Sequence, residues 1–219
     1  MAKINISFEK IRKYLLDVSV VVIGVAITLA ASYWITGNNE RRDMALYLDT
    51  IKLELEENKS MLDSTVKRLQ PSVKYADYLR SHDMKSLNAD TIRFYAPFYL
   101  EVASINIKTD AFDMFKTSGN MRLVKDKKLL LTIWETYARL AEFKETFDSF
   151  MQMKTDEIRK EVELRSLYDL WLLPDEELLK NVPIHKYYTR ISAPYMLPAA
   201  CKHSSNMISE TITKLEEAK

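Results

Sequence analysis

The side chains best suited to chemistry in this chain are three histidines and one cysteine. His82, His185 and His203 lie far apart, and none belongs to an HExxH motif or a similarly spaced pair. A metal site would have to be assembled wholly by folding, so each is interpreted as a surface or capped histidine. Cys201 precedes His203 by two residues, and side chains at i and i+2 diverge on a helix. This pair therefore does not indicate a nucleophile beside its base.

Composition argues against nucleotide and nucleic-acid binding. Phosphate-binding loops need clustered glycines, and the three glycines of this chain, Gly24, Gly37 and Gly119, are widely separated. The formal net charge is +1, and the 32 basic residues are scattered among 31 acidic ones, as on a solvated surface. We therefore predict that the protein is not an enzyme and that it binds no cofactor, nucleotide or nucleic acid.

The element that must position any site is an apolar stretch near the N-terminus. The run LLDVSVVVIGVAITLAASYWI begins at Leu15, and Asp17 is its only ionisable residue. A helix of about 20 residues crosses a hydrocarbon core of about 30 Å. The sequence therefore predicts a transmembrane helix over residues 15–36, in contact with the lipid bilayer.

A cleavable signal sequence that ends at Ala30 is the alternative interpretation. The apolar run continues past that point, however, and Tyr33 and Trp34 fall where an aromatic belt would meet the far membrane interface. An uncleaved anchor is therefore favoured.

Basic residues near the ends of the span set its expected orientation. Lys3, Lys10, Arg12 and Lys13 precede it, while Arg41, Arg42 and Lys52 follow among several acids. This bias places residues 1–14 in the cytoplasm and exports the rest, to the periplasm if the cell is Gram-negative. The predicted location is thus the inner membrane, and a single cysteine builds no disulfide framework in an exported domain.

Small side chains repeat every four residues along one face of the span. Gly24, Thr28 and Ser32 make this face, which would permit close approach of another helix in lipid. The alternative is that the face simply meets lipid.

A heptad-like stripe predicts a stalk helix over residues 37–70. Its apolar members are Met44, Leu48, Ile51, Leu55, Leu62 and Leu69, and Asn58 and Thr65 are its polar members. Packing on later helices of the same chain is favoured over a coiled coil between chains. A proline at position 71 is expected to end or kink this helix.

Residues 71–219 are predicted to form a helical bundle that packs on the stalk, which makes the fold all-α. A short helix from Ala89 is expected to stop before Pro97, and the stretch from Val102 to Ile107 is ambiguous between strand and helix. A final amphipathic helix is expected from about Ala199 to Glu217.

The densest local signal is a helix, glycine turn, helix joint. Thr109 is expected to cap the first helix, which has Phe112 and Phe115 on one face. Gly119 and Asn120 are expected to supply left-handed residues that end it, and Asp126 to cap the second helix. The apolar side of that second helix is predicted to hold Leu130, Trp134, Tyr137, Leu140 or Ala141, and Phe147.

Several segments resemble a family of single-pass, membrane-anchored helical proteins from Bacteroidota. The resemblance rests on KIRKYLL, VVIGVAITL, ELEENK and above all MFKTSGNMRLVKDKKLLLTIWETY, and it covers most of residues 8–150. Its most specific part is Ser118 to Asp126. The resemblance implies the anchor and the helical fold but no activity, and the end of the chain after Trp171 does not match.

Two functions remain open on the sequence alone. The first is an interaction or scaffold protein, whose anchor and stalk present a helical exported domain to a protein partner or to a second copy. The second is a ligand sensor, in which Tyr- and Phe-rich segments at residues 75–99 and 187–195 enclose a small molecule. About 14 residues precede the span, so a sensor would need a second protein to read its output, which favours the first function.

Overall fold

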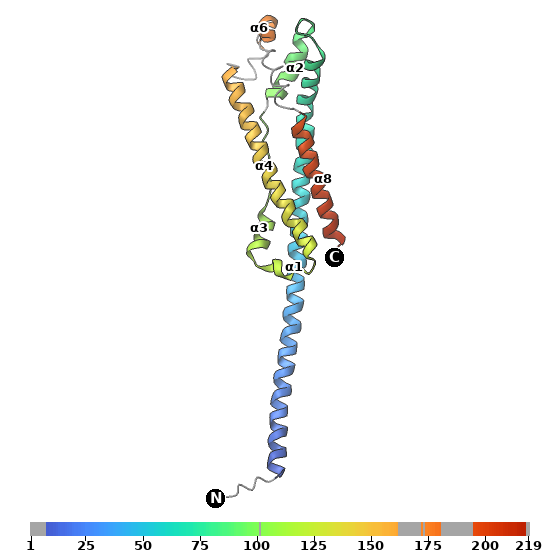
Figure 1. Ribbon diagram of the computed structural model, residues 1–219, viewed down its shortest axis with the longest axis vertical. Coiled ribbons are helices and arrows are strands. Elements are labelled where there is room, and N and C mark those ends of the chain that lie inside the picture. Colours follow the sequence, from blue (N-terminus) through green and yellow to red (C-terminus); the bar gives the residue numbers. More distant parts are fainter. Residues whose placement is uncertain (1–7, 101, 162–171, 173, 181–194, 218–219) are drawn as a thin grey trace. The chain divides into compact units, whose positions relative to one another are not determined.

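The computed structural model describes residues 8–100, 102–161, 172, 174–180 and 195–217. The chain divides into two compact units, Met1–Tyr47 and Leu48–Lys219. The fold is all-α, and no strand occurs in the described ranges (Figure 1). Its helices are α1 (Phe8–Ser81), α2 (Ala89–Leu100), α3 (Asp110–Thr117), α4 (Lys127–Glu161), α6 (Asp175–Lys180) and α8 (Met196–Glu217), with short 3₁₀ turns η1 (Met84–Ser86) and η2 (Asn120–Leu123).

The first unit consists of the N-terminal part of α1, which is long and apolar enough to cross a membrane. Its valine, isoleucine and leucine side chains from Leu15 to Ile35 are 40–68% exposed. Tyr33 and Trp34 are the most exposed, at 79% and 75%. No other described part of the first unit covers this apolar surface. Such an exposed apolar surface is expected of a helix that contacts lipid.

The second unit is built around three long helical segments: residues 48–81 of α1, α4 and α8 (Figure 1). Direct hydrogen bonds join each pair of these segments. Tyr137 of α4 donates to Glu54 of α1, and Ser205 of α8 donates to Asp63 of α1. Thr136 of α4 and Thr211 of α8 share a hydrogen bond of 2.8 Å, so α4 and α8 also contact one another.

The predicted stripe on α1 is the core of the second unit. Its members Leu48, Ile51, Leu55, Asn58, Leu62, Thr65 and Leu69 are all buried by residues of the same chain. Met44, the first predicted member, is only half-buried. The stripe therefore packs within the chain, as favoured, and a coiled coil between chains is not needed to cover it.

Neither Pro71 nor Pro97 ends its helix. The expected stop at Pro97 is therefore wrong, and of the two outcomes expected at Pro71, an end or a kink, the end does not occur. α1 continues past Pro71 to Ser81, and α2 continues past Pro97 to Leu100. A proline inside a helix costs about 3 kcal/mol. Burial of Tyr75 and Leu79, on the first two turns after Pro71, offsets that cost, because fully burying one large apolar side chain contributes about 1.5–3 kcal/mol.

The apolar face of α4 is displaced by one residue from the predicted one at its first two positions only. Leu129 and Ile133 are buried, whereas Leu130 is half-buried and Trp134 is 47% exposed. Tyr137, Leu140 and Phe147 are buried as predicted, and Ala141 is exposed. The sequence offers apolar residues at both registers, and contact with α1 and α8 selects one of them.

The described part of this helix ends at Glu161, so its predicted continuation toward Trp171 lies outside the described residues.

The sequence left the segment around Val102 to Ile107 open between strand and helix. In the structure, residues 102–109 form neither. Ala103, Ile105 and Ile107 are buried in alternation with exposed residues, which is the pattern of extended chain. Backbone groups of Ser104 and Lys108 in this segment bond to side chains of α1. Arg68, for example, donates to the Ser104 carbonyl at 3.1 Å.

Candidate functional site

A buried carboxylate of α1 joins α3 and α4 to α1 through hydrogen bonds. Glu54 is 7% exposed, and its Oε2 accepts from the Ala111 backbone N–H at 2.7 Å. Its Oε1 accepts from the Phe112 N–H at 3.4 Å and from the Tyr137 hydroxyl at 2.6 Å. Glu54 thus caps the first turn of α3 from another helix, where free N–H groups and the helix dipole favour a negative charge.

Aromatic stacking completes this cluster. The rings of Phe112 and Tyr137 stack with centroids 4.3 Å apart, and Trp134 meets Phe112 edge-on at 5.7 Å. Burial, followed by the hydrogen bond to Glu54, raises the pKa of Tyr137 well above its ordinary value of 10.0. The hydroxyl is the donor to Glu54, and the cluster thereby joins α1, α3 and α4.

Asn58, one of the two polar members of the α1 stripe, holds the extended segment against α1. Its Nδ2 donates to the Lys108 carbonyl and its Oδ1 accepts from the Lys108 N–H, each at 2.8 Å. One amide side chain thereby satisfies both backbone groups of a residue that has no strand partner.

The predicted joint is present, with two exceptions. Thr109 precedes α3, but its hydroxyl accepts from no backbone N–H and donates instead to the Asp113 carboxylate at 3.0 Å. Gly119 has φ of +73°, as expected for a left-handed residue after a helix, but Asn120 does not, because no described residue other than glycine has positive φ. The Asp126 carboxylate accepts from the Lys128 and Leu129 N–H groups at 2.8 and 3.1 Å and caps α4 as predicted.

The small-residue face of the first unit is open along its length. Thr28 donates to the Gly24 carbonyl at 2.9 Å, so its hydroxyl is satisfied within the helix. A methyl group added at Gly24 would meet nothing within 4 Å. Gly24, Thr28 and Ser32 are all exposed, and a second helix would therefore find this face accessible.

The histidines and the cysteine do not form a reactive cluster in the described part of the chain, which contains no group of three or more potential metal ligands. His82 is exposed, and its Nδ1 lies 2.9 Å from the Tyr78 carbonyl. His203 is also exposed, and His185 lies outside the described residues. Cys201 is fully buried, and burial raises the pKa of its thiol to about 11, which makes it unreactive at neutral pH.

The aromatic segments proposed for a ligand sensor are only partly described. Tyr75 is fully buried and its ring stacks 6.2 Å from that of Tyr95, so it belongs to the core. Tyr195 donates to Asp77 at 2.6 Å and lies under the Arg80 guanidinium, which fastens the start of α8 to the end of α1. The segment 181–194 lies outside the described residues.

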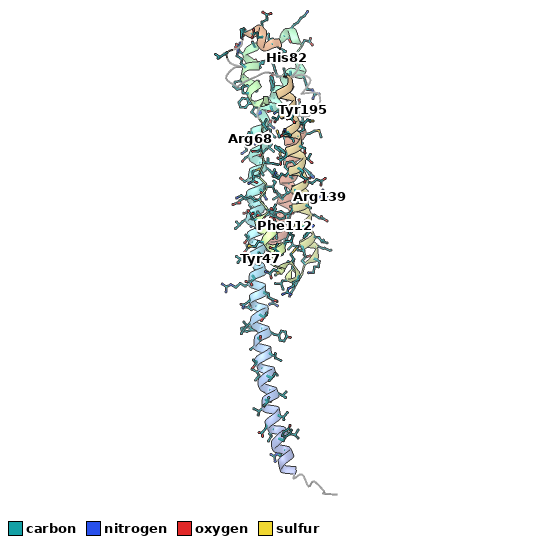
Figure 2. The ribbon with its side chains drawn as sticks, turned by 90° about the vertical axis from the view of Figure 1, so that its left-hand side faces the viewer. Tyr47, Arg68, His82, Phe112, Arg139 and Tyr195 are labelled. Carbon is teal, nitrogen blue, oxygen red and sulfur yellow. The ribbon has the colours of Figure 1, made fainter. Side chains whose placement is uncertain are left out.

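A groove between α4 and α8 was not anticipated from the sequence. It encloses about 370 Å³, and Arg139, labelled in Figure 2, is one of its lining residues. Four of its ten lining residues come from α4 and six from α8, and all but one of them are polar or charged. Each helix places charged side chains four residues apart, Glu135 and Arg139 on one and Glu210 and Lys214 on the other. That spacing is visible in the sequence, but the pairing of the two helices is not.

Comparison with known proteins adds no family to this description. No protein-family model, no curated protein and no solved structure matches the chain.

Proposed function

We propose that this protein is a membrane-anchored interaction or scaffold protein, which presents an exported helical domain to a protein partner or to a second copy of itself. The observation that carries the proposal is the exposed apolar surface of α1 from Leu15 to Ile35. In lipid this surface is stable, and its small-residue face allows another transmembrane helix to approach closely.

The proposed topology places residues 1–14 in the cytoplasm and the second unit in the periplasm, with the span in the inner membrane. The excess of basic residues before the span supports this orientation. The resemblance to the membrane-anchored Bacteroidota family is consistent with it. An accessory subunit of an envelope complex, or a self-assembling module, fits this arrangement.

Native mass spectrometry of the full chain, extracted from its own membrane in a mild detergent, tests the proposal. The expected result is a stoichiometric second protein or a defined oligomer. Recovery of monomers alone would contradict it.

A substitution in the span tests which face makes the contact. A Cβ atom added at Gly24 meets no neighbouring atom of the chain within 4 Å. Gly24→Leu should therefore leave the second unit folded but abolish co-purification of the partner. The matched control is Ala26→Leu, because a residue two positions away lies on nearly the opposite face of a helix. Equal recovery of the partner with both variants would remove the small-residue face from the proposal.

A further inference from the structure

The groove between α4 and α8 carries an inference that goes beyond the proposed function and does not rest on it. A hydrophobic helix needs apolar anchors to dock in a groove. Met207 is the one apolar residue that lines this groove, whose volume of about 370 Å³ is at the small end of small-molecule sites. The lining therefore suits a small polar molecule rather than a partner helix.

The charges along the groove follow a definite order. Thr136 lies opposite Thr211, at 2.8 Å, and Lys214 Nζ lies 3.4 Å from the Thr132 hydroxyl. These two contacts show that α4 and α8 run antiparallel here. In that register Glu135 and Glu210 lie about 3 Å apart along the helix axes, one on either side of the level of the paired threonines.

The cationic groups lie beyond this level in both directions. Arg139 lies four residues, or about 6 Å, along α4 from Glu135. Lys214 lies on the other side, four residues along α8 from Glu210. The groove thus presents two carboxylates between two cations, and Glu135, Arg139 and Glu210 make no hydrogen bond or ion pair with one another.

We infer that this groove binds a short peptide that carries free amino and carboxyl termini. Its ammonium group would lie between Glu135 and Glu210, and its carboxylate would accept from the Arg139 guanidinium, which suits bidentate carboxylate binding. The termini of an extended dipeptide are about 6 Å apart, and Arg139 lies three residues, or about 4.5 Å along the helix axis, from the level between the two carboxylates. A single α-amino acid carries both charges on one carbon and therefore spans less of this distance than a dipeptide.

Binding is tested with the full-length protein in detergent micelles, labelled with ¹³C at its methionine methyl groups. The signal of Met207, assigned with Met207→Leu, reports the groove, and the exposed Met114 and Met153 serve as controls. The probe is diglycine. The expected result is a saturable shift of the Met207 signal with the signals of Met114 and Met153 unchanged.

Two blocked probes separate the charge requirements without any mutation. N-acetyldiglycine lacks the ammonium group, and diglycine amide lacks the carboxylate. Each should bind at least about tenfold more weakly than diglycine, because each leaves one charged pair of the groove unmatched. Absence of a Met207 shift with diglycine, or equal shifts with all three probes, would overturn the inference.

Two variants then place the contacts. Arg139→Gln and Glu210→Gln change exposed side chains, so the thermal unfolding of both should match that of the natural chain. Arg139→Gln should weaken diglycine but not diglycine amide, and Glu210→Gln should weaken diglycine but not N-acetyldiglycine. Unchanged affinity of both variants for all three probes would overturn the inference.

Discussion

A single buried carboxylate decides where α3 lies against α1. Glu54 is buried and accepts from two backbone N–H groups and the Tyr137 hydroxyl, so its loss leaves three donors without this acceptor. An unsatisfied buried polar group costs more than a typical hydrogen bond contributes. Among the described residues, this cluster is where one substitution should have a large effect.

Glu54→Ala should lower the free energy of unfolding of the second unit by about 2–3 kcal/mol. The change is measured by urea-induced unfolding of the full chain in a mild detergent, followed by circular dichroism. Its matched control is Glu57→Ala on the same helix, which removes the ion pair with Lys108, where the Glu57 side chain is 59% exposed. Exposed pairs contribute about 0–1 kcal/mol, so equal losses from the two variants would show that Glu54 is not an anchor.

At the scale of elements, the joint between α3 and α4 depends on one backbone conformation. Gly119 has positive φ, where a Cβ atom is strained, and no neighbouring atom would obstruct that Cβ. Any cost of a side chain at this position is therefore a backbone cost alone.

Gly119→Ala should destabilise the second unit by about 1 kcal/mol. Asn120→Ala, at the next position, should change stability by less than about 0.5 kcal/mol, because Asn120 has negative φ and begins η2. Both are measured from the midpoint of thermal unfolding. A larger loss from Asn120→Ala than from Gly119→Ala would contradict this account of the joint.

The sequence predicted these elements better than their ends and faces. The cap at Asp126 and the left-handed Gly119 follow from local chemistry, so they were predictable from a few residues, whereas Thr109 holds the expected position before α3 without making the capping bond. The continuation of α1 through Pro71 was not, because it depends on contacts that Tyr75 and Leu79 make with distant parts of the chain. The burial of Leu129 and Ile133 in α4, in place of the predicted Leu130 and Trp134, was not predictable for the same reason.

At the scale of the whole molecule, the proposed orientation makes a direct prediction. Alkaline phosphatase becomes active only where its disulfides form, outside the cytoplasm. A fusion after Lys219 should be active, and a fusion after residue 13, before the span, should be inactive. The reverse pattern would place the helical domain in the cytoplasm and contradict the proposed topology.

The candidate sites also divide into those that lie on one helix, which the sequence predicted, and those that packing brings together, which it did not. The small-residue face at Gly24, Thr28 and Ser32 was predictable, because it lies on one helix and follows from helical periodicity. The α1 stripe was predictable too, including its polar member Asn58. The Glu54 cluster and the groove between α4 and α8 were not, because each joins residues more than 50 positions apart.

The sequence by itself determined that the chain is helical, that one helix is apolar enough to cross a membrane, and which stripe of α1 is buried. These properties depend on periodicity and composition within a single helix, where neighbouring side chains are a few residues apart. Only the tertiary structure decided that α1 continues past Pro71, that Glu54 caps α3, and that α4 and α8 pair with their charges in one groove. Those outcomes depend on the burial and hydrogen bonding of residues brought together by packing, and a local pattern does not encode the register of that packing.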